Sequence, residues 1–80
     1  MNAAKRIGGA AGYSVRVVKN RGVVRQIQLW HDSSMRKLFE ADAHLLDAAL
    51  ESVHALGLEA KDSAHLTALM QDAHQRRCLE

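Results

Sequence analysis

The spacing of apolar residues changes once along this chain, and that change limits the folds open to it. From Tyr13 apolar and polar residues alternate, so that Tyr13, Val15 and Val17 share one face of an extended segment. The residues from Lys19 to Gly22 have turn chemistry, because Asn and Gly tolerate positive φ. A second β-rich run follows from Val23 to Trp30. These features predict a β-hairpin.

After Asp32 the apolar residues follow helical spacing. They form one continuous stripe that includes Phe39, Leu46 and Val53. This predicts a long helix from about Ser33 to Leu56, ending at Gly57. A shorter helix is expected from Asp62 or Ser63 to about Gln75. The predicted fold class is α+β, a β-hairpin followed by two α-helices (ββαα), as one domain over residues 13–78.

The two ends of the chain lack such patterns. Residues 1–12 contain Gly8, Gly9 and Gly12 among small alanines, and we interpret them as a flexible basic arm. Leu79 and Glu80 have the form of a cloning scar. Cys78 is the only cysteine, so an intramolecular disulfide is excluded.

A hairpin covered by two helices leaves both strand edges unpaired, and a chain of 80 residues buries only a small core. We therefore expect a homodimer in which two hairpins join edge to edge into a four-stranded antiparallel sheet. Dimerisation through the long helix is the alternative, and the sequence does not decide between them.

Charge is divided unevenly along the chain. No acidic residue precedes Asp32, so the cations of residues 1–31 have no neighbouring carboxylates, although the net charge is only +2. Such a division of charge along a chain indicates what kind of partner the protein binds. We predict that the hairpin and the N-terminal arm bind an anionic partner through Lys5, Arg6, Arg16, Lys19 and Arg21.

The expected function is that of a small non-enzymatic binding or regulatory module acting through protein–protein interaction. A DNA- or RNA-binding regulator using the same basic hairpin is the alternative, because a two-stranded ribbon fits the major groove. A small enzyme with its site in a dimer cleft is the second alternative. No cofactor or metal is expected. Glu51 and His54 have the spacing of a pair of metal ligands, but they lie on the helix face opposite the apolar stripe.

Two charged residues interrupt otherwise apolar faces. Arg25 lies between Val23 and Ile27 in the second strand, and Asp42 lies within the helical stripe. Because isolated buried charges are costly, we predict that Arg25 and Asp42 form a buried ion pair where hairpin and helix meet.

The chain also lacks an apolar run long enough to cross a bilayer, and its N-terminus lacks the hydrophobic core of a signal peptide. We therefore expect a cytoplasmic protein with no membrane partner.

Overall fold

A computed structural model describes residues 3–77 of the chain. The elements occur in the order ββββαα. The strands are β1 (Lys5–Ala10), β2 (Tyr13–Asn20), β3 (Val23–His31) and β4 (Arg36–Asp42), and the helices are α1 (Leu46–His54) and α2 (Ala60–Gln75). The predicted α+β class is confirmed, but with four strands in one chain.

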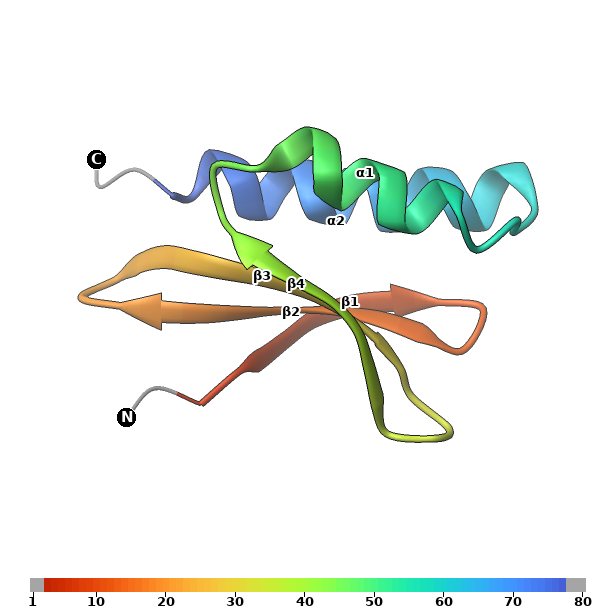
Figure 1. Ribbon diagram of the computed structural model, residues 1–80, viewed down its shortest axis with the longest axis horizontal. Helices are drawn as coiled ribbons and strands as arrows, with labels where there is room; N and C mark the ends of the chain where they lie inside the picture. The colour runs from red at the N-terminus through yellow and green to blue at the C-terminus, as the bar shows by residue number, and fades with distance from the viewer. Residues whose placement is uncertain (1–2, 78–80) are drawn as a thin grey trace.

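The four strands form a single antiparallel sheet in the order β1-β2-β3-β4. Both helices lie on one side of this sheet, so the molecule has two layers and the other sheet face is left uncovered (Figure 1). No helix within the described range 3–77 is long and apolar enough to span a membrane.

Tight turns connect the first three strands. Ala11 and Gly12 have φ of 54° and 85°, and Arg21 and Gly22 have φ of 57° and 78°. Two successive residues with positive φ are typical of the two-residue turns whose twist matches that of the flanking strands. The hairpin predicted from Asn20, Arg21 and Gly22 is therefore confirmed.

The core lies between the sheet and the helices. Val15 and Val17 of β2 and Ile27 and Leu29 of β3 are at most 1% exposed, and they face the helix layer. The helices contribute buried residues to the same cluster: Ala49, Val53, Leu66, Met70 and Ala73. The alternation seen in the sequence correctly indicated which hairpin face is buried.

The predicted long helix is wrong over its first half. Residues 36–42 form β4, which pairs with β3, and α1 covers only Leu46–His54. Phe39 packs against the core from the strand. The helical spacing of Phe39 and Leu46 was coincidental, because the two residues lie in different elements. The shorter helix ends at Gln75 as expected.

The predicted flexible arm is also wrong where the structure describes it. Lys5–Ala10 pair with β2, and the glycines serve close packing. A Cβ on Gly8 would lie 2.9 Å from Leu69 of α2, and a Cβ on Gly9 would lie 2.5 Å from the guanidinium of Arg6. The proposed scar at Leu79 and Glu80 lies outside the described residues.

The four-stranded sheet was expected from two copies of the chain, and one copy supplies it. The reason given for a dimer, a lone hairpin with two open edges, therefore does not hold. The open edges are instead those of β1 and β4.

Candidate functional site

The structure separates the predicted anion-binding residues into two groups. Arg6 and Arg16 lie opposite each other on β1 and β2, on the sheet face that the helices leave uncovered. Lys5, Lys19 and Arg21 lie toward the end of the molecule that holds the β2–β3 turn. The two groups differ in whether their cations have ion-pair partners within the fold.

On the uncovered face, Asp32 forms an ion pair with both arginines, and its single negative charge offsets one of their two positive charges. Its carboxylate lies 3.7 Å from Arg6 and 3.6 Å from Arg16, and it accepts a hydrogen bond of 2.6 Å from the Ser14 hydroxyl. Ser14 is fully buried, and the guanidinium of Arg16 stacks 4.3 Å above the ring of Trp30. Such cation–π contacts fix the position of an arginine. Arg6 and Arg16 are therefore engaged within the fold.

A chain of hydrogen bonds continues across the same face. Trp30 Nε1 donates to Gln28 Oε1 at 2.7 Å, and Gln28 Nε2 donates to Glu40 at 2.7 Å. Glu40 also accepts from Lys37 at 3.1 Å. These bonds from Lys37 and Gln28 favour the ionised carboxylate and lower the pKa of Glu40 below its ordinary value of 4.5. Most polar groups of this face are thus paired with one another, while Arg16 Nε is buried without a hydrogen-bond partner among the described residues.

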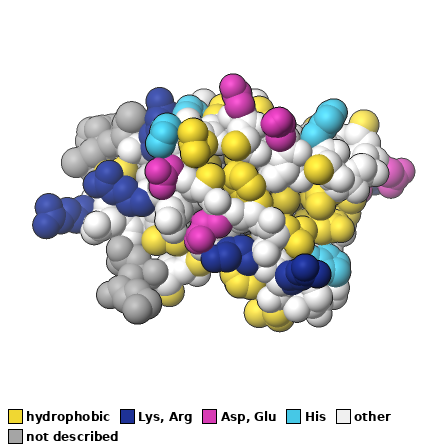
Figure 2. All heavy atoms as spheres, in the orientation of Figure 1, with side chains coloured by type: hydrophobic (Ala, Val, Ile, Leu, Met, Phe, Trp, Pro, Cys, Tyr) yellow, Lys and Arg dark blue, Asp and Glu magenta, His cyan; other side chains and the backbone are white. Residues whose placement is uncertain are grey.

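The second group belongs to a larger cluster that we call the basic end. Lys5, Lys19 and Arg76 line one hollow, to which Arg6 and Asp72 also contribute, and Arg25 and Arg77 line another. The amide of Val24 donates to the carbonyl of Arg76 at 3.1 Å, which ties the end of α2 to the hairpin. Lys and Arg side chains gather at this left-hand end in Figure 2. The basic end comprises Lys5, Lys19, Arg21, Arg25, Arg76 and Arg77.

Most of these cations have no internal partner. Arg76 pairs with Asp72 at 3.1 Å, and Arg77 donates to the carbonyl of His74 at 2.7 Å. Within residues 3–77, no ion pair or side-chain hydrogen bond engages the remaining four: Lys5, Lys19, Arg21 and Arg25. All four are exposed. Their charge is available to a partner.

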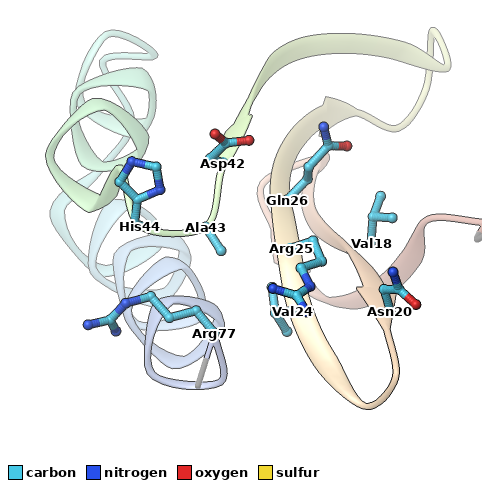
Figure 3. Close-up of a pocket in the computed structure, with 9 residues that line it drawn as sticks. All are labelled: Val18, Asn20, Val24, Arg25, Gln26, Asp42, Ala43, His44 and Arg77. Atoms are coloured by element: carbon cyan, nitrogen blue, oxygen red, sulfur yellow. The ribbon is translucent and has the colours of Figure 1, made fainter. Parts of the chain in front are cut away.

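A groove of about 670 Å³ opens at the basic end. Figure 3 shows β3 on one side, the helix layer on the other and the segment from Asp42 to His44 crossing between them. Val18, Val24 and Ala43 give the lining an apolar part, and Arg25 contributes a cation. The groove therefore offers both apolar contact and positive charge.

The predicted buried ion pair between Arg25 and Asp42 is wrong. Both residues are exposed, and among the described residues no ion pair joins them. The register of β2 and β3 shifts between Val18 and Lys19, which pair with Gln26 and Val24, so Arg25 has no partner in β2. This β-bulge places Val24 in the core and turns Arg25 outward. Asp42 lies opposite Gln26 at the exposed end of β4.

The conformation of Arg21 is unusual for its residue type. Its φ of 57° is in the left-handed region, which costs an L-residue with a Cβ about 1–2 kcal/mol. Asn or Gly would adopt it more readily. Ala11 in the β1–β2 turn and Met35 before β4 adopt similar values, 54° and 53°.

Sequence reasoning did not include Arg25, Arg76 and Arg77 in the binding surface. Arg76 and Arg77 follow α2, far along the chain from the hairpin, and only the tertiary fold brings them to Val24. No group of three or more His, Cys, Asp or Glu side chains able to hold a metal ion occurs in the part of the chain that the structure describes.

Comparisons of the chain with protein-family models, with curated proteins and with solved structures gave no match. Function is therefore inferred from the geometry of the basic end alone.

Proposed function

We propose that this chain is a non-enzymatic binding module whose basic end holds an acidic segment of a partner protein. The observation that carries the proposal is the contrast between two sets of cations. Arg6 and Arg16 each form an ion pair with Asp32, whereas Lys5, Lys19, Arg21 and Arg25 have no internal partner within residues 3–77. Surface cations left unpaired at one end attract a polyanion and steer its approach.

The groove favours a peptide over a phosphate backbone. Its partly exposed Val18 offers apolar contact to a side chain of a bound peptide, and Arg25 lies beside it to meet a carboxylate. Val24 and Ala43 also line the groove but are buried. The aromatic residues Tyr13 and Trp30 pair with Ala10 and Ser14 near the other end of β2, so they are not placed to stack bases at the basic end.

Duplex nucleic acid is the second candidate. The tip of the β2–β3 hairpin extends past the helix layer at the left of Figure 1, and a two-stranded ribbon fits a major groove. With about four to six phosphate contacts, affinity would fall by about two orders of magnitude between about 50 and 200 mM salt.

Fluorescence anisotropy with a labelled decaglutamate peptide and a labelled random DNA duplex distinguishes these partners. We expect saturable binding of the peptide, weakened by salt because the contacts are exposed. Tighter binding of the duplex than of the peptide would instead support the nucleic-acid candidate. Absence of binding to either probe at low salt would contradict the proposal.

A matched pair of variants tests whether the peptide binds at the basic end. Lys19→Gln removes one charge from the basic end, and Lys61→Gln makes the same change at the start of α2, an exposed position. We expect Lys19→Gln to weaken peptide binding several-fold and Lys61→Gln to leave it unchanged. Equal effects of the two variants would show that only total charge matters.

A further inference from the structure

The large apolar side chains exposed to solvent are concentrated around one strand. Among the described residues these are Met35, Leu38 and Leu45, which are 65%, 42% and 44% exposed. Leu38 lies within β4, Met35 directly precedes Arg36, and Leu45 follows shortly after Asp42. Exposed apolar side chains grouped in this way mark an interaction surface.

The strand beside these residues has an open edge. β4 is the last strand of the sheet and pairs only with β3. The amide of Ala43 donates to the carbonyl of Arg25 at 2.8 Å, so this pair is hydrogen-bonded. Because bonded and non-bonded pairs alternate in an antiparallel ladder, the backbone groups of Asp42 and Glu40 point away from β3. They are available to another strand.

The charges along β4 are self-complementary. Arg36 and Lys37 lie at its beginning, and Glu40 and Asp42 lie toward its end. Lys37 and Glu40 already pair with each other within the chain at 3.1 Å. When two copies of β4 are placed antiparallel about Phe39, Arg36 of each copy lies opposite Asp42 of the other. The other open edge, β1, has Lys5 and Arg6 at its start and no acidic residue to oppose them.

We propose that two copies of this chain associate through their β4 edges, forming a continuous eight-stranded antiparallel sheet. The arrangement is a closed two-fold dimer. It places Met35 of one copy opposite Ala43 of the other, two residues before the exposed Leu45, and it places Leu38 of each copy within the interface. A second copy, rather than another protein, is favoured by this match of opposite charges across the strand.

The dimer has a consequence for the groove at the basic end. Among the described residues, Asp42 is the one carboxylate that lines this groove. In the antiparallel pairing, Arg36 of the second copy lies opposite Asp42 and offsets its charge. The two basic ends then lie at opposite ends of the dimer, an arrangement suited to bivalent binding. The dimer itself does not depend on the proposed function.

Two charge-reversed variants test the interface. Arg36→Glu/Lys37→Glu makes β4 entirely acidic in its charged residues, and Glu40→Lys/Asp42→Lys makes it entirely basic. We expect the wild-type chain to be a dimer at micromolar concentration by sedimentation velocity. Each variant alone is expected to be a monomer, because like charges then face each other across the edge. An equimolar mixture of the two is expected to form a heterodimer.

The mixture separates loss of the interface from loss of the fold, because two misfolded chains would not restore a defined dimer. Lys5→Glu, a reversal on the β1 edge, is the matched control and should remain a dimer. A monomeric wild type would overturn the proposal. Variants that remain dimers alone, or monomers that stay monomers when mixed, would also overturn it.

Discussion

The backbone amide of Ala43 donates to the carbonyl of Arg25 at 2.8 Å, across the point where β4 leaves the sheet. From there the chain crosses to the helix layer, and the groove opens beside β3 (Figure 3). The β-bulge at Arg25 turns its side chain outward at the same place. The crossing of the chain and the β-bulge therefore bring the groove and the cation of Arg25 to the same place.

Arg21→Asn should separate stability from binding. Asn adopts the φ of 57° more readily than Arg and precedes Gly22, a favoured turn pair, so the free energy of unfolding should rise by about 1 kcal/mol. The variant also loses a charge from the basic end, so decaglutamate should bind more weakly. Urea denaturation and fluorescence anisotropy measure the two effects. Stabilisation with unchanged binding would exclude Arg21 from the binding surface.

Asp32→Ala should destabilise the sheet by about 2 kcal/mol, because the buried Ser14 hydroxyl loses its acceptor and the guanidinium of Arg16 loses its ion-pair partner. Asp32→Asn should cost less, since the amide oxygen still accepts from Ser14. Thermal and urea unfolding of both variants test this order. Glu59→Ala, at an exposed position without a side-chain cap, is the control and should stay within about 0.5 kcal/mol of wild type.

The neighbouring glycines of β1 should respond differently to alanine. A Cβ on Gly9 would collide with the backbone carbonyl of Tyr13, so Gly9→Ala should cost about 1–3 kcal/mol. A Cβ on Gly8 meets only the end of the Leu69 side chain, at 2.9 Å, which can move. Gly8→Ala should therefore cost less. Equal costs in urea denaturation would show that β1 is not held in this register.

Glu40 should make stability depend on pH in the acid range. Its pKa is below 4.5 in the folded protein because Lys37 and Gln28 donate to it, so its contribution is complete above the unfolded pKa. That contribution is lost as the pH falls through the folded pKa. The stability difference between wild type and Glu40→Gln should thus shrink from near neutral pH to about pH 3. A difference that stays constant over this range would contradict the assignment.

The elements differ in how far local pattern determined them. The β2–β3 hairpin was predictable because apolar alternation and the Asn20-Arg21-Gly22 turn agree. β4 was not, because its residues have helical propensity and become a strand only through pairing with β3. β1 was not predictable because Gly8 and Gly9 have no side chains and therefore show no alternation of apolar and polar residues. The reason for these glycines is their close approach to Leu69 and Arg6, which only the structure reveals.

The candidate site was predictable to a similar degree. The basic first part of the chain placed Lys5, Arg6, Arg16, Lys19 and Arg21 in one predicted binding surface, and of these Lys5, Arg6 and Lys19 line the same hollow. The ion pairs of Asp32 with Arg6 and Arg16 depend on the register of the strands. The amino-acid composition does not reveal that register. Arg25 was assigned to the buried face because strict alternation along a strand assumes an unbroken register. The β-bulge shifts the register at this residue.

The measurement that tests the central claim most directly is an amide chemical-shift titration of the isotopically labelled chain with decaglutamate. We expect the largest shifts at the basic end, at Lys5, Lys19, Arg21 and Arg25, and along the groove at Val24 and Ala43. The amides of Ser14, Gln28 and Trp30 on the uncovered sheet face should change little. The arginines of that face are already ion-paired with Asp32. Shifts confined to that sheet face, or none at all, would contradict the account.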